Sequence, residues 1–183
     1  MNIPNFISSI RLLLVPVLLA LAWQGASKAF LFCLVFSLVS DIVDGKIARR
    51  LGQVTESGAR LDSWGDFLTY LALVPSSWWL RPDFVGDELA FLIIVAASYL
   101  IPIAFGFVKY GRLTSYHTRL ATLAAYVLGA SVIVVFAGGP TFLFRVAVLF
   151  SVLAEIEEVA ITAVLPAWQA NVPSLNYALR NER

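Results

Sequence analysis

The chain has 183 residues, of which 60% are hydrophobic and only 14% are charged. A soluble domain of this length carries about a quarter charged residues, so the composition indicates a membrane protein. The formal net charge of +1 gives no reason to expect a nucleic-acid partner, and the single cysteine excludes an internal disulfide.

Apolar runs long enough to cross a bilayer, about 20 residues each, follow one another along the chain. They predict an all-α polytopic membrane protein with six transmembrane helices, at roughly 8–24, 28–45, 61–80, 88–108, 119–137 and 141–165. Pro16 interrupts the first run, and polar stretches such as 46–60 separate the others. With no repeat or soluble segment in view, residues 1–183 are interpreted as one membrane domain with an interfacial tail from 166 to 183.

The orientation of these helices is predicted from the thirteen Lys and Arg residues. Ten of them fall on one side of the six-helix arrangement, and only Lys28, Arg81 and Arg145 fall on the other. Cytoplasmic loops of membrane proteins carry the excess of Lys and Arg. We therefore expect both termini and the polar segment 41–66 to face the cytoplasm, in the cell inner membrane or an equivalent membrane.

Four aspartates occur at regular intervals in this segment. Asp41 and Asp44 are three apart near the end of one apolar run, and Asp62 and Asp66 are four apart at the start of the next. Both spacings place a pair on one helical face, and we expect antiparallel neighbouring helices with opposed acidic faces. Carboxylates gathered near a bilayer need cations to offset their repulsion. Oxygen-only ligands favour Mg²⁺ or Mn²⁺, and two such ions can clamp a phosphoryl displacement.

The residues between the two acidic pairs suit a phosphate-bearing ligand. Gly45 and Ala48 follow the first two aspartates by four residues each, which leaves a surface poor in side chains for a flat ligand such as a nucleotide. Arg49 can neutralise a diphosphate, and Gly58 removes bulk before the second pair. Singly, such features are more often helix caps or helix-packing positions. Eight specified positions in one short segment favour the functional interpretation.

These eight positions fit the pattern D-x2-D-G-x2-A-R-x8-G-x3-D-x3-D without departure. In this the chain resembles the CDP-alcohol phosphotransferases, integral-membrane enzymes of phospholipid synthesis. The opening "IPNFISSIR" is also similar to the family's PN-x-[LI]-[TS]-x2-R, through Pro4, Asn5, Ser8 and Arg11. The resemblance implies that an acceptor hydroxyl attacks a phosphorus of a CDP-linked donor, usually CDP-diacylglycerol, with release of CMP. It also implies a homodimer.

The same resemblance implies roles for individual residues. The metal ligands would be Asp41, Asp44, Asp62 and Asp66, and Asp66 would also be the catalytic base that takes the acceptor's proton. The CDP-donor site would comprise Gly45, Ala48, Arg49 and Gly58, with further contacts from Thr55, Asn5 and Ser8.

The resemblance implies that the acceptor is a small alcohol or an alcohol phosphate. Members that make phosphatidylglycerol phosphate or cardiolipin typically carry "LDPLADK", whereas "LDSWGDF" has Ser63 for Pro and Phe67 for Lys and looks closer to the phosphatidylserine-forming branch. This weakens the glycerol-phosphate alternative without excluding it. A basic cluster could hold an acceptor phosphate or anchor the chain at lipid headgroups. Two glutamates of the last run could favour an amine-bearing acceptor or pair with that cluster. These candidates are Lys109, Arg112, His117 and Arg119, and Glu155 and Glu158.

Two other functions are compatible with an acidic membrane site. A CDP-lipid hydrolase would use water as the acceptor, and an ion-coupled transporter would use the carboxylates as an ion site. Transporters usually place charge near the bilayer midplane and often contain repeats. Here the acids cluster toward one face of the membrane, which favours the phosphotransferase.

Overall fold

The structure is a computed structural model that describes residues 3–50, 56–112, 114, 116, 118–169 and 172–181. At 3–8, 44–50, 56–64, 66 and 181 it describes the backbone only. The described part of the chain is helical and contains no strand, which confirms the all-α prediction. The chain divides into two compact units, Met1–Gly86 and Asp87–Arg183.

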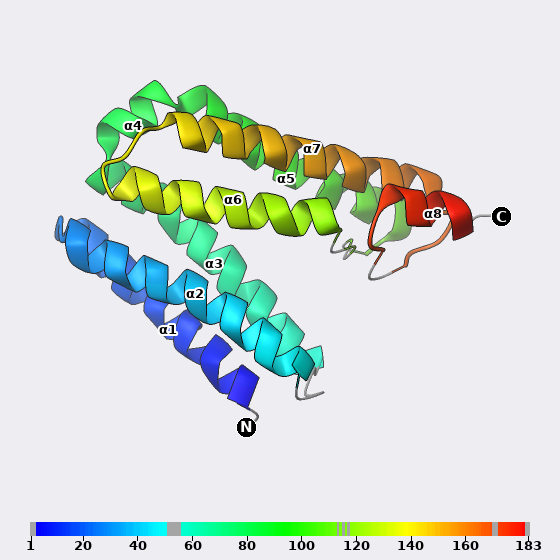
Figure 1. The fold of residues 1–183 in the computed structure, drawn as a ribbon, viewed down its shortest axis with the longest axis horizontal. Coiled ribbons are helices and arrows are strands. Elements are labelled where there is room, and N and C mark those ends of the chain that lie inside the picture. Colours follow the sequence, from blue (N-terminus) through cyan, green and yellow to red (C-terminus); the bar gives the residue numbers. More distant parts are fainter. Residues whose placement is uncertain are drawn as a thin grey trace. The chain divides into compact units, whose positions relative to one another are not determined.

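The first unit contains α1 (Ile3–Trp23), α2 (Ser27–Arg50) and α3 (Glu56–Leu80), followed by the short α4 (Pro82–Asp87). Figure 1 shows α1 and α2 as an antiparallel hairpin. The α1 helix packs against both α2 and α3, and its buried apolar residues include Leu18 and Ala22. Near the ends of α1 and α3, the rings of Trp23 and Trp79 meet edge to face with centroids 5.0 Å apart.

Two expectations about this unit are wrong. The stretch 46–60 was expected to separate two helices, yet α2 continues to Arg50 and α3 already begins at Glu56. Pro16 does not interrupt α1 either, since the helix is continuous through it. In the described residues α2 and α3 each pack against α1. The opposed acidic faces of α2 and α3 stay a prediction, because most of the side chains that would form them lie outside those described.

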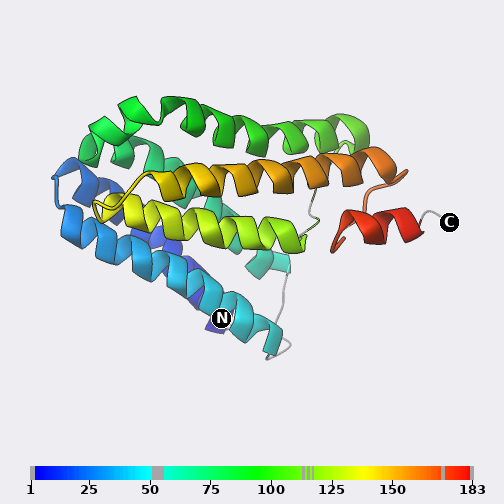
Figure 2. The same cartoon turned by 45° about the horizontal axis from the view of Figure 1, so that its top comes forward.

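The second unit contains α5 (Leu89–Tyr110), α6 (Arg119–Phe136), α7 (Phe142–Val164) and α8 (Leu175–Asn181). The α7 helix packs against the other three, and Figure 2 shows it between α5 and α6. Its buried face carries small and apolar residues such as Ala147, Val148 and Ala154. In the described part of the chain, α5 and α6 are long and apolar enough to cross a membrane, which supports membrane association.

The connection between α5 and α6 has defined ends. Gly111 follows the last residue of α5 with φ of 65°, a left-handed conformation that glycine adopts without strain, and its N–H donates to the Phe107 carbonyl at 2.8 Å. Thr118 caps α6, because its hydroxyl accepts a hydrogen bond from the Ala121 N–H at 3.0 Å.

An ion pair between the buried Glu88 and the half-exposed Arg145 joins the start of α5 to α7. The Glu88 carboxylate is fully buried, and Arg145 donates to both of its oxygens, from Nε at 2.9 and 3.0 Å and from Nη2 at 2.7 Å. The hydrogen bonds from Arg145 lower the pKa of Glu88 below its ordinary value of 4.5, although burial opposes this shift. One charged contact thus joins the start of α5 to the first turn of α7.

This pair predicts a pH dependence of stability. A carboxyl whose pKa is lowered in the folded state contributes stability above its unfolded pKa and loses that contribution as the pH falls through its folded pKa. We expect Glu88→Gln to lower the melting temperature by a few degrees at neutral pH, and the difference from wild type to shrink in acid below the ordinary glutamate pKa. Thermal unfolding at stepwise lower pH measures this, with Asp83→Asn, which alters an exposed aspartate of α4, as the matched control. If Glu88→Gln lowered the melting temperature equally at every pH, this prediction would be contradicted.

Candidate active site

The acidic motif lies on two helix ends of the first unit. Positions 41 and 44 fall in the last turns of α2, and positions 62 and 66 fall in the early turns of α3. The two aspartate pairs, with spacings of three and four residues, therefore both lie on helices, as the sequence predicted. Thr55 lies outside the described residues, and so do the side chains of the remaining motif and donor-site residues: Asn5, Ser8, Asp44, Gly45, Ala48, Arg49, Gly58, Asp62 and Asp66.

Asp41 is the motif carboxylate whose side chain is described, and it is paired with Arg11. Nη1 of Arg11 donates to Oδ1 of Asp41, which joins the middle of α1 to the end of α2. The Arg11 side chain is 2% exposed, whereas that of Asp41 is 32% exposed. The arginine is therefore enclosed between helices, and the carboxylate lies at the edge of the packed region.

The same guanidinium also lies against α3. A Cβ added to Gly65 would stand 2.8 Å from Nε and 3.0 Å from Nη2 of Arg11. Gly65 is itself buried, and its carbonyl accepts a hydrogen bond from Thr69 at 2.7 Å within α3. Because Gly65 stands between positions 62 and 66 of the motif, Arg11 contacts segments that belong to both acidic pairs.

Carboxylate oxygens are the donors that Mg²⁺ and Mn²⁺ prefer, so the chemistry of the motif fits a hard divalent ion. The ion pair engages Asp41 through Oδ1. In the side chains that are described, no three His, Cys, Asp or Glu residues come together as a metal site. The motif aspartates remain the predicted ligands.

Lys109 has a well-defined structural contact in the second unit. Its ammonium donates to the carbonyls of Thr162, Ala163 and Leu165 at 2.7–2.9 Å, at the end of α7. A cation suits the negative end of a helix, where carbonyls lack partners within the helix. The Tyr110 hydroxyl donates toward two of the same carbonyls. Lys109 therefore holds the end of α5 to the end of α7.

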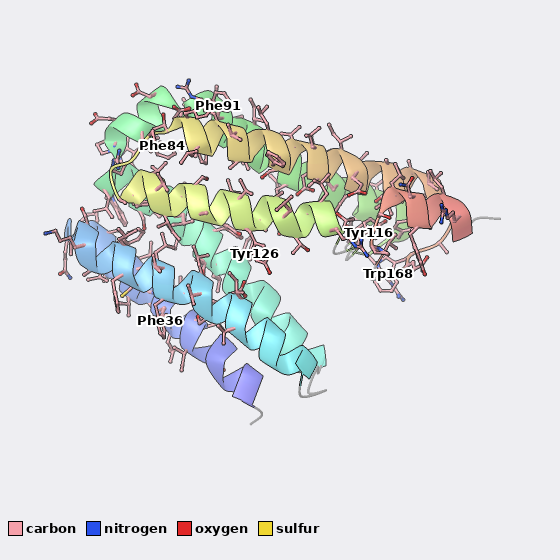
Figure 3. All side chains as sticks on the ribbon, viewed as in Figure 1. Phe36, Phe84, Phe91, Tyr116, Tyr126 and Trp168 are labelled. Atoms are coloured by element: carbon pink, nitrogen blue, oxygen red, sulfur yellow. The ribbon has the colours of Figure 1, made fainter. Side chains whose placement is uncertain are left out.

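The C-terminal segment packs on the end of α7. Tyr116, Ile161, Leu165, Val172 and Ala178 form a buried cluster there. The Tyr116 and Thr162 hydroxyls are hydrogen bonded at 2.9 Å. Figure 3 shows Tyr116 and Trp168 at this end of the second unit, near α8. The loop after α5 is thus anchored through Tyr116.

Two of the predicted acceptor residues lie around this end. The Arg112 guanidinium is 5.8 Å from the centre of the Trp168 ring, and Arg119 begins α6. Arg119 lines a surface cavity of about 410 Å³ together with Arg180 of α8. The other lining residues are Pro173, Ser174, Asn176 and Tyr177. Two arginines at one cavity suit an anionic group. His117 lies outside the described residues.

The glutamates of α7 occupy different environments. Glu155 and Glu158 are half-buried, and in the described residues no ion pair joins either to Arg112 or Arg119. Glu157 instead accepts a hydrogen bond from the Leu175 N–H at 3.1 Å, which fixes the start of α8. The expected pairing with the basic cluster is therefore not formed among these residues.

A comparison with protein-family models decides the family. The model described as CDP-alcohol phosphatidyltransferase matches residues 1–170. The chain belongs to this family. The match includes both motif helices and α1, so the CDP-alcohol phosphatidyltransferase resemblance seen in the sequence is confirmed.

Curated relatives agree with the family. A Mycobacterium tuberculosis protein, named provisionally as a cardiolipin synthase, is 42% identical over 76 residues, 41% of this chain and 36% of the relative. Two others are named CDP-diacylglycerol–glycerol-3-phosphate 3-phosphatidyltransferase. The Pseudomonas fluorescens protein is 40% identical over 37% of this chain and 36% of its own length. The Rickettsia typhi protein is 29% identical over 69% of this chain and 71% of its own length. The match thus spans about a third of the first two relatives.

Sequence reasoning missed two residues of this family member's candidate site. Arg11 was noted only as part of an N-terminal pattern, although a charge inside an apolar run is itself a signal. Arg180 lies in the polar tail, where nothing in the sequence indicates that α8 brings it beside Arg119.

Proposed function

We propose that this protein transfers the phosphatidyl group of CDP-diacylglycerol to the hydroxyl of an acceptor alcohol and releases CMP. The observation that carries the proposal is the complete eight-residue motif within residues 1–170, the range that matches the family model. Both motif segments lie on helices that pack against α1. This arrangement supports a site at the ends of α2 and α3.

The chain's own residues would act on the two substrates in different ways. Gly45, Ala48, Arg49 and Gly58 would bind the CDP moiety, with Thr55, Asn5 and Ser8 as further contacts. Asp41, Asp44, Asp62 and Asp66 would hold one or two Mg²⁺ or Mn²⁺ ions, which when bound would supply positive charge at the diphosphate. Positioning and charge neutralisation account for most phosphoryl-transfer catalysis.

Asp66 would take the proton of the acceptor hydroxyl while the hydroxyl oxygen attacks the phosphorus. The bond between this phosphorus and the CMP oxygen breaks, and CMP leaves with the bonding electrons. The acceptor oxygen becomes the new phosphodiester oxygen. Atoms and charge balance without any oxidant or further reactant.

For the acceptor we propose glycerol 3-phosphate. Two of the relatives above are named for this acceptor, although Ser63 and Phe67 depart from the pattern typical of that branch. The cavity lined by Arg119 and Arg180 offers two guanidinium groups that suit a phosphate. Arg112 and His117 belong to the same loop region, and Glu155 and Glu158 are kept as acceptor candidates from α7.

The membrane arrangement forms part of the proposal. Six helices, α1, α2, α3, α5, α6 and α7, would cross the membrane, with both termini and the acidic motif on the cytoplasmic side. The bias of Lys and Arg toward that side supports this orientation. We further propose that the 183 residues act as one membrane domain and form a homodimer.

Measuring CMP release tests the reaction. The purified protein in lipid nanodiscs is given CDP-diacylglycerol and Mn²⁺ or Mg²⁺, with one acceptor at a time. The panel comprises glycerol 3-phosphate, serine, inositol, inositol phosphate, choline and phosphatidylglycerol. We expect acceptor-dependent CMP release that is greatest with glycerol 3-phosphate and that stops when EDTA removes the divalent ion.

The panel also separates the alternatives. Equal CMP release with and without an alcohol would identify a CDP-lipid hydrolase. Preference for serine would retain the reaction and replace the acceptor. No CMP release from folded protein with any acceptor would overturn the proposed function.

A further inference from the structure

Arg11 is enclosed within the first unit and cannot leave its place without repacking. Its side chain is 2% exposed, and it reaches Asp41 from the helix that packs on both motif helices. A guanidinium remains charged at any physiological pH. The acidic end of α2 therefore has a permanent positive charge beside it.

The contact with Asp41 leaves part of that carboxylate available. Nη1 donates to Oδ1, and a carboxylate carries a second oxygen with its own acceptor positions. The Asp41 side chain is 32% exposed, so it is reachable from outside the packed region. Fixing one oxygen of a carboxylate restricts its rotation and orients the other oxygen.

On its other side the guanidinium rests on Gly65. The 2.8 Å and 3.0 Å distances from a Cβ at this position to Nε and Nη2 leave no room for a side chain. Glycine therefore permits the guanidinium to lie against α3, one residue before Asp66. Arg11 of α1 therefore contacts both motif helices.

We propose that Arg11 is a positioning residue for the divalent-ion site: it holds Asp41 by one oxygen, leaves the other for the ion, and offsets the negative charge of the acidic cluster. This inference rests on the proposed function, because it assigns the motif aspartates to a metal ion. Hydrogen bonds to ligating carboxylates tune affinity in this way in other metal sites. The positioning role differs from a role in folding alone, because a residue needed only for folding would leave the ion affinity of a folded variant unchanged.

The test measures Mn²⁺ binding directly, by electron paramagnetic resonance of the free ion in titrations of protein in nanodiscs. We expect Arg11→Gln to weaken Mn²⁺ affinity by roughly 10- to 100-fold. Loss of the fixed Asp41 oxygen acts in this direction, whereas loss of the guanidinium charge alone would favour a cation, so weaker binding identifies the orientation of Asp41 as the larger effect. Lys28→Gln removes an exposed cation from the start of α2 and serves as the matched control, with unchanged affinity.

A second variant keeps Arg11 and covers the case in which Arg11→Gln does not fold. Gly65→Ala displaces the guanidinium while the charge remains, and we expect it to weaken Mn²⁺ binding by a smaller factor than Arg11→Gln. Gly86→Ala is its control, because a Cβ there meets nothing within 4 Å. Thermal unfolding in EDTA shows for each variant whether the fold survives without the ion.

The outcomes separate this inference from the proposed function. Wild-type affinity or tighter binding in folded Arg11→Gln, or in folded Gly65→Ala if the first variant is unfolded, would overturn the positioning role. Failure of both variants to fold would overturn it too, since Arg11 would then be required for folding. Absence of Mn²⁺ binding and CMP release in the wild type would instead overturn the proposed function.

Discussion

Replacing Gly106 with alanine should lower the free energy of unfolding by roughly 1–3 kcal/mol, the usual cost of overpacking. Gly106 is buried in α5, and a Cβ there would stand 2.3 Å from Cγ2 of Thr114 and 3.4 Å from its Cβ. A Cβ at position 106 would therefore force the Thr114 side chain into another rotamer or displace Thr114 itself. In a helix alanine is otherwise more stable than glycine by about 1 kcal/mol. Only the contact with Thr114 can therefore make this substitution destabilising.

The clash can be relieved from the other side. Thr114→Ser removes Cγ2, so combining it with Gly106→Ala should restore stability to that of the wild type or above. Chemical unfolding of the two single variants and the double variant measures the coupling. Gly86→Ala is the control, since open space surrounds that position. Additive losses in the double variant would show that the Thr114 methyl is not the cause.

The same variant bears on the acceptor region. The loop carries Arg112, and it is anchored through Tyr116 to Thr162 of α7. A shift of the loop should therefore raise the KM for the acceptor more than the KM for CDP-diacylglycerol. The double variant should reverse this effect together with the loss of stability.

Hydropathy predicted a helix over most of each long helix that the described part of the chain contains, namely α1, α2, α3, α5, α6 and α7, although α5 and α6 are the two there that are long and apolar enough to cross a membrane. It misplaced the ends of α2 and α3, since it treats polar residues as breaks, whereas residues 46–50 and 56–60 continue the helices. The short helices α4 and α8 have too few apolar residues to give a hydropathy signal. Pro16 was expected to interrupt α1, yet a helix can continue through a proline when neighbouring helices support it.

The motif spacing identified the candidate site, but not the partner of Asp41. A sequence gives the register of residues on one helix, whereas the contact of Arg11 with Asp41 depends on how α1 packs against α2 and α3. Lys109 illustrates the same limit. Its charge suggested an acceptor phosphate, but the end of α7 supplies three carbonyls that take its ammonium hydrogens. Only the folded chain shows that these carbonyls need donors.

Asp66→Asn should reduce turnover by roughly a hundred- to ten-thousand-fold, the range associated with a general acid or base. An amide has nearly the shape of the carboxylate but cannot accept the acceptor's proton. With three other aspartates retained, we expect Mn²⁺-dependent binding of CDP to change little. CMP release and equilibrium binding of CDP, both measured with Mn²⁺ in nanodiscs, provide the comparison.

Two further variants make the assignment specific. Asp41→Asn should weaken Mn²⁺ binding as well as turnover, because Asp41 is assigned to the ion and not to the proton. Asp83→Asn alters an exposed aspartate of α4 and should leave both quantities unchanged. If Asp66→Asn lost CDP and Mn²⁺ binding while remaining folded, Asp66 would be a ligand only, and another group would have to take the proton. Near-normal turnover in Asp66→Asn would remove the general base from the proposed reaction, because the remaining aspartates are all assigned to the ion.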